Sequence, residues 1–356
     1  MAQTADYRLG PHTFARGWHM IADASTVQAE PVAIRFFARD MVLYRGQSGT
    51  PHLVDAYCPH MGAHLARNET SYIVRDAQRI DGESIRCPFH GWRFGPDGVC
   101  NHIPYSDQRI PQAARIASWP VIERAGVIWM WHDEEGNAPD HELPEFAAWD
   151  DPSWVRWVID DLGELPQHPQ EVFDNMTDFA HFVPIHGSCD VEYFVNEFDG
   201  HIAWQYFGAG HRTLVSAPGQ LLKTDTWYTG PAILQSKMLG DYPTHMLIAH
   251  TPVEDGRIRV WHALMVKTDK AQATDADVPA ARAYQQASLD AFAQDFEIWK
   301  YKRPALSPLK VRGDGPVEKG RTWYRQFYNP IAEAPRIQTN VNGIYATVDK
   351  RTQAAA

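Results

Sequence analysis

Short runs of apolar residues alternate with turn residues over the first third of the chain. Four of these runs are rich in β-branched or large apolar side chains, which strands favour. They cover residues 32–37, 41–44, 52–56 and 127–131. Gly, Pro, Asp and Ser separate them, as at residues 45–49 and 95–98. The pattern predicts a small all-β domain between Pro31 and about His132.

The pattern changes beyond residues 133–140, an acidic, proline-containing stretch that we interpret as a domain boundary. The elements predicted beyond it are a helix near residues 170–183, strands from about 201 to 267, a long helix over 278–302 and a last helix over 316–327. The sequence therefore predicts an α+β fold. An all-β domain occupies residues 16–132, and a domain with an antiparallel sheet and a long helix occupies residues 133–356.

Composition is that of an ordinary folded protein, and charge narrows the choice of partners. Of 356 residues, 44% are hydrophobic and 22% are charged. The formal net charge of −11 repels phosphates, which argues against a nucleic-acid partner. The first residues lack the basic and then apolar pattern of an export signal, and no stretch approaches about 18 uninterrupted apolar residues. We therefore expect a cytoplasmic protein without a membrane span.

Two short Cys/His clusters carry the chemistry of the predicted all-β domain. Cys58 and His60 form a Cys-x-His motif, Cys87 and His90 form a Cys-x-x-His motif, and 26 residues lie between the motifs. Two thiolates and two imidazoles are the ligands of a Rieske [2Fe–2S] centre, in which two His replace two Cys on one iron. The neutral imidazoles raise the reduction potential, so such a centre accepts electrons readily.

Zinc is the alternative for this site, because a structural Zn²⁺ also takes Cys₂His₂ ligands with short spacing. The long separation of the two motifs, their unequal spacing and the lack of a His-x₃₋₅-His signature disfavour zinc. Cys100 and Cys189 are the remaining cysteines, and we expect both to be free and buried. The polar segment 68–83 between the motifs is expected to be a solvated loop.

A second candidate metal site lies in the predicted helix near residues 170–183. Asp178, His181 and His186 form an Asp-x₂-His-x₄-His pattern. The two imidazoles would diverge on a regular helix, but Pro184 disfavours helical geometry at the residue before it and lets them converge. The alternative is a solvated polar helix face. The members of this face are Glu171, Asp174, Asn175, Asp178 and His181.

The long helix supplies a carboxylate in an anomalous position. Projected at about 100° per residue, Asp295 falls within the apolar stripe of the helix, whereas Asp290 and Glu297 point the other way. A buried acid must be paired or bind a metal, so the alternative is a salt bridge to an Arg or to Lys302. With the two histidines, Asp295 would complete a 2-His-1-carboxylate triad, which leaves open positions on Fe(II) for O₂.

Together these motifs resemble the Rieske non-haem iron oxygenases over nearly the whole chain, and within that group the oxygenase component of 3-ketosteroid 9α-hydroxylase. The segments that carry the resemblance are residues 15–19 (ARGWH), 55–63 (DAYCPHMGA), 102–105 (HIPY), 131–133 (WHD), 295–300 (DFEIWK), 314–317 (DGPV) and 323–328 (WYRQFY). The chain departs from the family pattern at residues 187–190 and in the longer loop 68–83.

The resemblance implies a role for each motif. Residues 16–132 would be a Rieske domain whose cluster ligands are Cys58, His60, Cys87 and His90. Residues 133–356 would be a catalytic domain whose iron ligands are His181, His186 and Asp295. Asp178 matches a bridging carboxylate that accepts a hydrogen bond from His181 and meets a cluster histidine of a neighbouring subunit. Asn175, on the same polar face, is a further catalytic candidate.

The resemblance also implies a function: the terminal oxygenase component of a multicomponent monooxygenase. A homotrimer would use O₂ and NADH-derived electrons from a flavin/iron–sulfur reductase, with or without a ferredoxin, to hydroxylate a bulky, apolar, steroid-like substrate. Alternatives are a non-steroid aromatic or alkaloid-like substrate, desaturation or dealkylation, a Rieske electron carrier, and a zinc-stabilised binding module. Aromatic residues of the second domain are pocket candidates, although core packing is the more common role for such residues. They are Tyr193, Phe194, Trp204, Tyr206 and Trp227.

Overall fold

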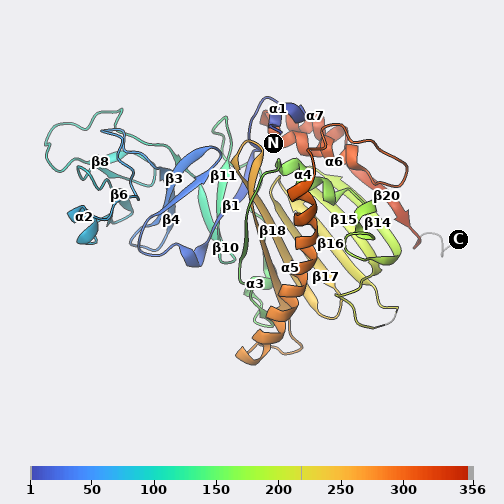
Figure 1. The fold of residues 1–356 in the computed structure, drawn as a ribbon. Helices are drawn as coiled ribbons and strands as arrows, with labels where there is room; N and C mark the ends of the chain where they lie inside the picture. The colour runs from blue at the N-terminus through green and yellow to red at the C-terminus, as the bar shows by residue number, and fades with distance from the viewer. Residues whose placement is uncertain (1, 218, 352–356) are drawn as a thin grey trace. The chain divides into compact units, whose positions relative to one another are not determined.

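The computed structural model describes residues 2–217 and 219–351, and these divide into two compact units (Figure 1). The smaller unit comprises His19–His132. The larger unit combines the segment up to Trp18 with the chain from Asp133 onward. The N-terminal segment therefore packs with the second half of the chain, which no local pattern in the sequence indicates.

The smaller unit is fully described and consists of three antiparallel sheets. Their strands, in order across each sheet, are β1 (Gly17–Asp23), β11 (Val127–His132) and β10 (Val121–Arg124); β2 (Val32–Phe36), β3 (Arg39–Arg45), β4 (Pro51–Asp55) and β9 (Ser118–Trp119); and β5 (Ile80–Asp81), β6 (Ser84–Arg86), β7 (Arg93–Phe94) and β8 (Cys100–His102). The four predicted strands are present as β2, β3, β4 and β11. The apolar run of β11 is buried along its whole length.

The segment 68–83 is more ordered than the expected solvated loop. It contains the one-turn helix α2 (Tyr72–Arg75) and the strand β5. Arg79 is only 7% exposed, and its guanidinium donates hydrogen bonds to the carbonyls of Ala66 and Asn68. The segment is otherwise exposed or half-buried, so it is solvated as expected except at Arg79, and it also contains short regular elements.

The larger unit is built on one antiparallel sheet, to which nine strands contribute within the described ranges. In order across the sheet these are β12 (Trp154–Val155), β19 (Arg257–Lys267), β18 (Pro243–Glu254), β17 (Ile233–Leu239), β16 (Leu222–Thr229), β15 (Ile202–Gly210), β14 (Cys189–Asp199) and β20 (Gly343–Asp349), and β13 (Asp160–Leu165) also pairs with β19. The helices are α1 (Thr4–Tyr7), α3 (Ala147–Asp150), α4 (Pro169–Phe173), α5 (Val278–Tyr301), α6 (Val317–Tyr324) and α7 (Ala334–Thr339). The predicted α+β fold, with an antiparallel sheet and a long helix, is confirmed.

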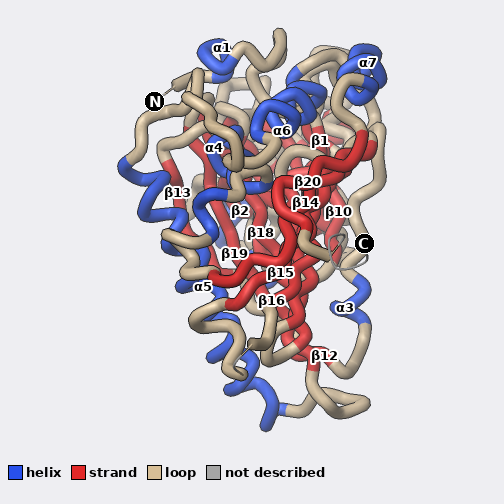
Figure 2. Tube along the Cα trace, turned by 90° about the vertical axis from the view of Figure 1, so that its right-hand side faces the viewer, coloured by secondary structure: helices blue, strands red, loops and turns tan. Residues whose placement is uncertain are grey.

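Helix α5 runs along one face of the sheet, and the short helices α1, α4, α6 and α7 gather at one end (Figures 1 and 2). A capping box of Thr274 and Asp277 precedes α5, and Pro279 occupies its first turn. The buried residues of α5 recur at intervals of three and four and so form one stripe. They are Ala281, Gln285, Ser288, Phe292, Asp295 and Trp299. The position predicted for Asp295 on this stripe is thus observed.

The predicted helix over residues 170–183 is broken, because tertiary hydrogen bonds take its backbone groups. Helix α4 ends at Phe173, and two 3₁₀ turns follow, at Asp174–Met176 and Ala180–Phe182. The side-chain amides of Asn196 and Gln205 donate to the Met176 carbonyl. The Phe179 N–H donates to the Asp314 carbonyl. These groups are no longer free to bond along a helix, and the chain turns before His181.

Two acids of this segment are buried in ion pairs, so a fully solvated polar face is excluded. Glu171 is completely buried, lies 2.6 Å from the ammonium group of Lys302, and accepts a hydrogen bond from the Tyr7 hydroxyl. Asp174 accepts hydrogen bonds from Arg321 and Gln170. Lys302, the alternative partner considered for Asp295, is therefore engaged elsewhere.

All four cysteines lie in the described part of the chain, and none forms a disulfide. Cys100 is buried as expected, but Cys189 is exposed at the start of β14, so its predicted burial was wrong. None of the helices in residues 2–217 and 219–351 combines the length and the apolar character needed to cross a bilayer.

The Asp174–Arg321 pair offers a test of this packing. The two side chains are 13% and 17% exposed, and Asp174→Ala would leave a largely buried guanidinium unpaired. We expect the free energy of unfolding of the larger unit, measured by urea titration, to fall by about 3 kcal/mol. The control is Glu318→Ala, which breaks an ion pair whose acid is 76% exposed and should cost less than about 1 kcal/mol. Equal losses would contradict the packing described.

Candidate functional site

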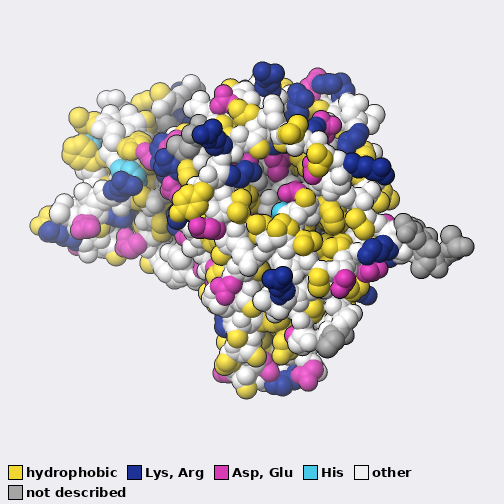
Figure 3. Space-filling model, turned by 45° about the vertical axis from the view of Figure 1, so that its right-hand side comes forward, with side chains coloured by type: hydrophobic (Ala, Val, Ile, Leu, Met, Phe, Trp, Pro, Cys, Tyr) yellow, Lys and Arg dark blue, Asp and Glu magenta, His cyan; other side chains and the backbone are white. Residues whose placement is uncertain are grey.

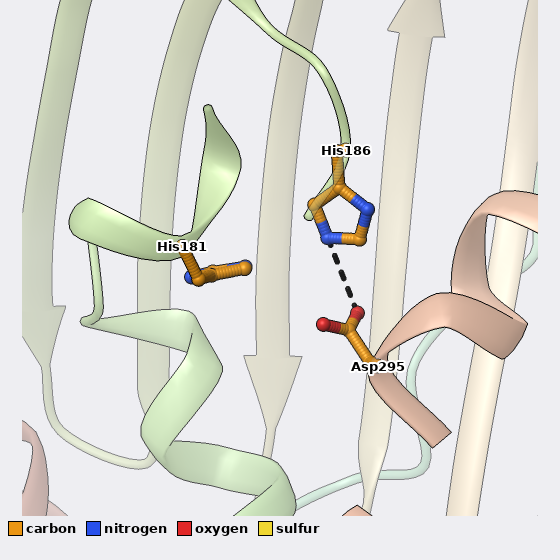
Figure 4. Close-up of side chains that lie close together, drawn as sticks. All are labelled: His181, His186 and Asp295. Atoms are coloured by element: carbon orange, nitrogen blue, oxygen red, sulfur yellow. Dashed lines mark ion pairs between the residues drawn. The ribbon is translucent and has the colours of Figure 1, made fainter. Parts of the chain in front are cut away.

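His181, His186 and Asp295 converge in the larger unit (Figure 4). One ligand atom from each lies within 4.8 Å of the others. His181 comes from the 3₁₀ turn Ala180–Phe182, His186 from the loop that follows, and Asp295 from α5. His186 Nε2 lies 3.2 Å from Asp295 Oδ2, and the side chains are 12%, 13% and 10% exposed, respectively. The structure thus brings these three side chains together, as the sequence predicted.

Electrostatics within this group follow from burial and proximity. Burial works to lower the pKa of His186, but the hydrogen bond and the charge of Asp295 outweigh it, so the pKa is raised. His211 also lines the cavity at this site. Burial, and then the nearby His186, lower the pKa of His211 to about 4. His211 is therefore neutral at pH 7. The sequence does not predict His211 as a site residue, because a single histidine after a strand belongs to no motif.

Asp178 and Asn175 border the triad from the same chain segment. Asp178 Oδ2 lies 3.4 Å from His181 Nδ1, and its other oxygen accepts a hydrogen bond from the Ala180 N–H. Burial alone would raise the pKa of Asp178, but its contact with His181 lowers it, so the carboxylate stays charged. Asn175 lies on the wall of the cavity beside the triad. Both residues thus lie where a positioning role at this site requires.

Cys58, His60, Cys87 and His90 form a second group in the smaller unit. Each cysteine begins a tight loop: the Gly62 N–H donates to the Cys58 carbonyl, and the Gly91 N–H to the Cys87 carbonyl. Both glycines have φ near +70°, which strains other residues. The hydrogen bond between the thiols lowers the pKa of Cys87 to about 6 and raises that of Cys58. The cysteines are buried, whereas His60 is exposed and His90 half-buried.

Both donor sets fit the metal groups predicted for them. In the smaller unit two buried thiols approach each other, and the imidazoles of His60 and His90 lie 4.7 Å apart between ring centroids. This is the Cys₂His₂ set of a Rieske cluster. In the larger unit two imidazoles and one carboxylate face a common point, which is the donor set of a non-haem Fe(II) oxygenase.

A cavity of about 160 Å³ opens beside the triad and is mostly apolar. The larger unit is hollowed on the face seen in Figure 3, and acidic and histidine side chains lie within the hollow among hydrophobic ones. Side chains of α5 and of strands β15 to β18 line the cavity. The apolar ones include Phe207, Leu234, Met246, Ile248, Phe292 and Trp299.

The five aromatic residues proposed for the pocket do not line it. Side chains alternate between the two faces of a strand, so Gln205 and Phe207 of β15 face the cavity while Trp204 and Tyr206 face the other way. Trp227 packs against Trp204 on that opposite face with the rings tilted, and Phe194 is fully buried in the core. To predict the residues that line the cavity, one would need the register of β15 against β14 and β16, which no local sequence pattern supplies.

Comparison with known families agrees with this geometry. Residues 17–120 match the Rieske [2Fe-2S] domain, and residues 130–328 match the 3-ketosteroid 9alpha-hydroxylase C-terminal domain. The chain belongs to the 3-ketosteroid 9α-hydroxylase family of Rieske oxygenases. It is therefore an enzyme of the Rieske oxygenase type, similar to oxygenase components of 3-ketosteroid-9-alpha-monooxygenase. It carries a Rieske [2Fe–2S] cluster and a mononuclear non-haem iron.

Three relatives illustrate the similarity of this oxygenase to known proteins. A 3-ketosteroid-9-alpha-monooxygenase oxygenase component of Rhodococcus rhodochrous is 33% identical over 355 residues, which cover 95% of this chain and 90% of that protein. Cholesterol 7-desaturase of Caenorhabditis elegans is 28% identical over 349 residues, covering 89% and 78%. The structure of Pseudomonas putida CBB5 NdmA with caffeine has a TM-score of 0.69 at 18% identity, covering 92% and 95%, which shows a shared fold.

Replacing Asp295 tests the assignment of the triad. Asp295→Ala removes one of the three ligands, so we expect iron to fall from about three to about two per chain while acid-labile sulfide stays at about two. Metal and sulfide analysis of the purified protein measures both. Asp290→Ala, on the exposed side of the same helix, is the control and should retain all the iron. Full iron content in the Asp295 variant would refute the assignment.

Proposed function

We propose that this oxygenase hydroxylates a bulky, apolar, steroid-like substrate held in the cavity beside His181, His186 and Asp295. The observation that carries the proposal is the position of these three residues at the edge of an apolar cavity in one unit. The family match and the names of the Rhodococcus relatives support a steroid. Bound iron would supply O₂ activation, and the cavity walls would orient one C–H bond and exclude water.

The ligand roles follow from the same geometry. In this proposal His181, His186 and Asp295 hold the mononuclear iron, and Cys58, His60, Cys87 and His90 hold the [2Fe–2S] cluster. Asn175 contacts the substrate or the iron site from the cavity wall. The enzyme works in the cytoplasm, where NADH is available to the reductase, and a ferredoxin is an optional intermediate carrier.

Asp178 is proposed to connect the two redox centres across a subunit boundary. Its carboxylate contacts His181 and is 35% exposed, so one side remains open to another chain. In a homotrimer, a cluster histidine of the adjacent subunit would donate a hydrogen bond to this open side. His60 is the more exposed of the two cluster histidines and suits that contact.

Desaturation is the second candidate outcome. Cholesterol 7-desaturase, a relative with 28% identity over most of the chain, favours it by name. Hydroxylation and desaturation need the same iron site, and they diverge only in the fate of the substrate after the first C–H bond is broken. The geometry of the triad does not distinguish them, whereas the product does.

A substrate panel tests this proposal. We expect O₂ consumption with reductase and NADH to rise on addition of a steroid ketone or alcohol, and not on addition of caffeine or small benzoates. Mass spectrometry should show a product that gains one oxygen atom, whereas desaturation would show loss of two hydrogen atoms. Rapid, coupled oxidation of a small aromatic with no response to any steroid would contradict the proposed substrate class.

Asp178→Asn tests the bridge, because it keeps the side-chain shape and the hydrogen bond to the Ala180 N–H but removes the charge. We expect both metal centres to remain loaded and turnover to fall roughly 10- to 100-fold. Stopped-flow absorbance should locate the loss in reoxidation of the pre-reduced cluster by O₂ and substrate. Wild-type reoxidation in this variant, or equal loss in Asp290→Ala, would exclude the bridging role.

A further inference from the structure

A chain of hydrogen bonds crosses the cavity wall and is separate from the iron site. Asp160 of β13 and His262 of β19 pair directly across the two strands. His262 Nδ1 lies 2.9 Å from Asp160 Oδ2, and His262 Nε2 lies 3.1 Å from Ser288 Oγ. Ser288 belongs to α5 and lines the cavity. The oxygenation chemistry proposed above gives none of these three residues a role.

The exposure of the three side chains shows which end of this series of hydrogen bonds faces solvent. The Asp160 side chain is 26% exposed, whereas His262 is fully buried and Ser288 is 4% exposed. Gln285 also donates to Asp160, over 2.7 Å, and this holds the carboxylate in place. The Asp160 carboxylate thus lies at the solvent-exposed end of this series of hydrogen bonds, and the Ser288 hydroxyl lies at the end inside the cavity.

The donor and acceptor roles follow from the carboxylate. A carboxylate only accepts, so Nδ1 of His262 carries the hydrogen of the 2.9 Å bond. With the single ring hydrogen on Nδ1, Nε2 is an acceptor, and the Ser288 O–H donates to it. The competing acceptor, Met246 Sδ at 3.7 Å, is weaker. The Ser288 hydrogen is therefore used, and its oxygen lone pairs remain for a partner in the cavity.

We propose that Ser288 is an acceptor that anchors a hydroxyl group of the substrate. Ser288 precedes Asp295 by seven residues on one face of α5, which places it about 10 Å along the helix from the iron-binding carboxylate. A rigid fused-ring molecule can reach from one to the other. The inference rests on the proposed function, because it specifies a polar group of the molecule that the cavity binds.

The same residue types in this order are found in serine hydrolases, but this site lacks their other requirement. Acyl transfer needs N–H donors aimed at the developing oxyanion. Ser288 lies in the interior of α5, where backbone N–H groups bond to carbonyls four residues earlier. The hydroxyl therefore serves binding rather than nucleophilic attack.

The anchor distinguishes an alcohol from a ketone on the same carbon. A hydroxyl can donate to the Ser288 oxygen, whereas a carbonyl offers only lone pairs and would face another acceptor. One net hydrogen bond in a buried site corresponds to roughly a tenfold change in affinity. We expect the wild-type enzyme to prefer the alcohol by about that factor.

Isothermal titration calorimetry of the iron-loaded enzyme without oxygen measures this preference independently of turnover. The probes are testosterone and androstenedione, which differ in whether one ring carbon carries a hydroxyl or a ketone. Ser288→Ala should weaken testosterone binding roughly tenfold and leave androstenedione within about twofold. Alanine favours the helix, so the fold is preserved.

Two further variants separate the anchor from general effects on the cavity. His262→Phe keeps a planar ring beside Phe292 but removes the acceptor, which frees the Ser288 hydrogen. The preference should then shift toward the ketone. Ser236→Ala removes a hydroxyl from β17 on the same cavity wall and should change both affinities alike.

The outcomes are distinct. Equal changes for the two steroids in Ser288→Ala, or no change for either, would overturn the anchor while leaving the proposed steroid oxygenase intact. If the wild-type enzyme binds neither steroid, the steroid assignment fails. The comparison of wild type with Ser288→Ala is then repeated with a bicyclic alcohol and its ketone, decalol and decalone, to test whether Ser288 anchors a hydroxyl group. A loss confined to the alcohol supports it, and any other pattern refutes it.

Discussion

The ion pair between Glu171 and Lys302 holds together the two chain segments on which the iron site depends. Glu171 lies on α4, which leads into the turn of His181, and Lys302 follows the last residue of α5, which carries Asp295. The carboxylate is fully buried, so loss of Lys302 would leave a buried negative charge without its partner. Gln167 strengthens the connection by donating to the carbonyls of Trp299 and Lys302. Segments more than 100 residues apart are thereby fixed against each other.

The sheet supplies the second requirement, a rigid wall for the cavity. Strands β15 to β18 place alternate side chains toward α5, and the apolar ones exclude water from the space beside the triad. Polar side chains interrupt this wall at several places, and some of them are bonded within it: Thr226 to Ser236, and Ser288 to His262. A substrate that enters such a cavity meets fixed partners, which suits selective oxidation of one C–H bond.

The sequence identified the side chains that converge in the structure more reliably than it predicted the backbone around them. The Cys/His spacing, and the position of Asp295 within the apolar stripe of its helix, are local features of the sequence. They can be recognised from residue type and spacing alone. The interruption of the predicted helix between Phe173 and His181 was missed, because it arises from hydrogen bonds to Asn196, Gln205 and Asp314, which are distant in sequence. The choice between cavity and core for the candidate aromatic residues stayed open for a related reason: a shift of one residue moves a side chain to the other face of the sheet. Motifs of metal-binding residues can be recognised in the sequence. Strand register, and hydrogen bonds from distant residues to backbone groups, cannot.

Two separate sets of side chains are proposed to bind iron, one as a cluster and one as a single ion. Anomalous diffraction from crystals of the loaded enzyme, recorded on both sides of the iron absorption edge, tests this proposal most directly. We expect one iron peak among Cys58, His60, Cys87 and His90, and a second among His181, His186 and Asp295. A zinc signal at the first position, or no iron between the two histidines and Asp295, would contradict it.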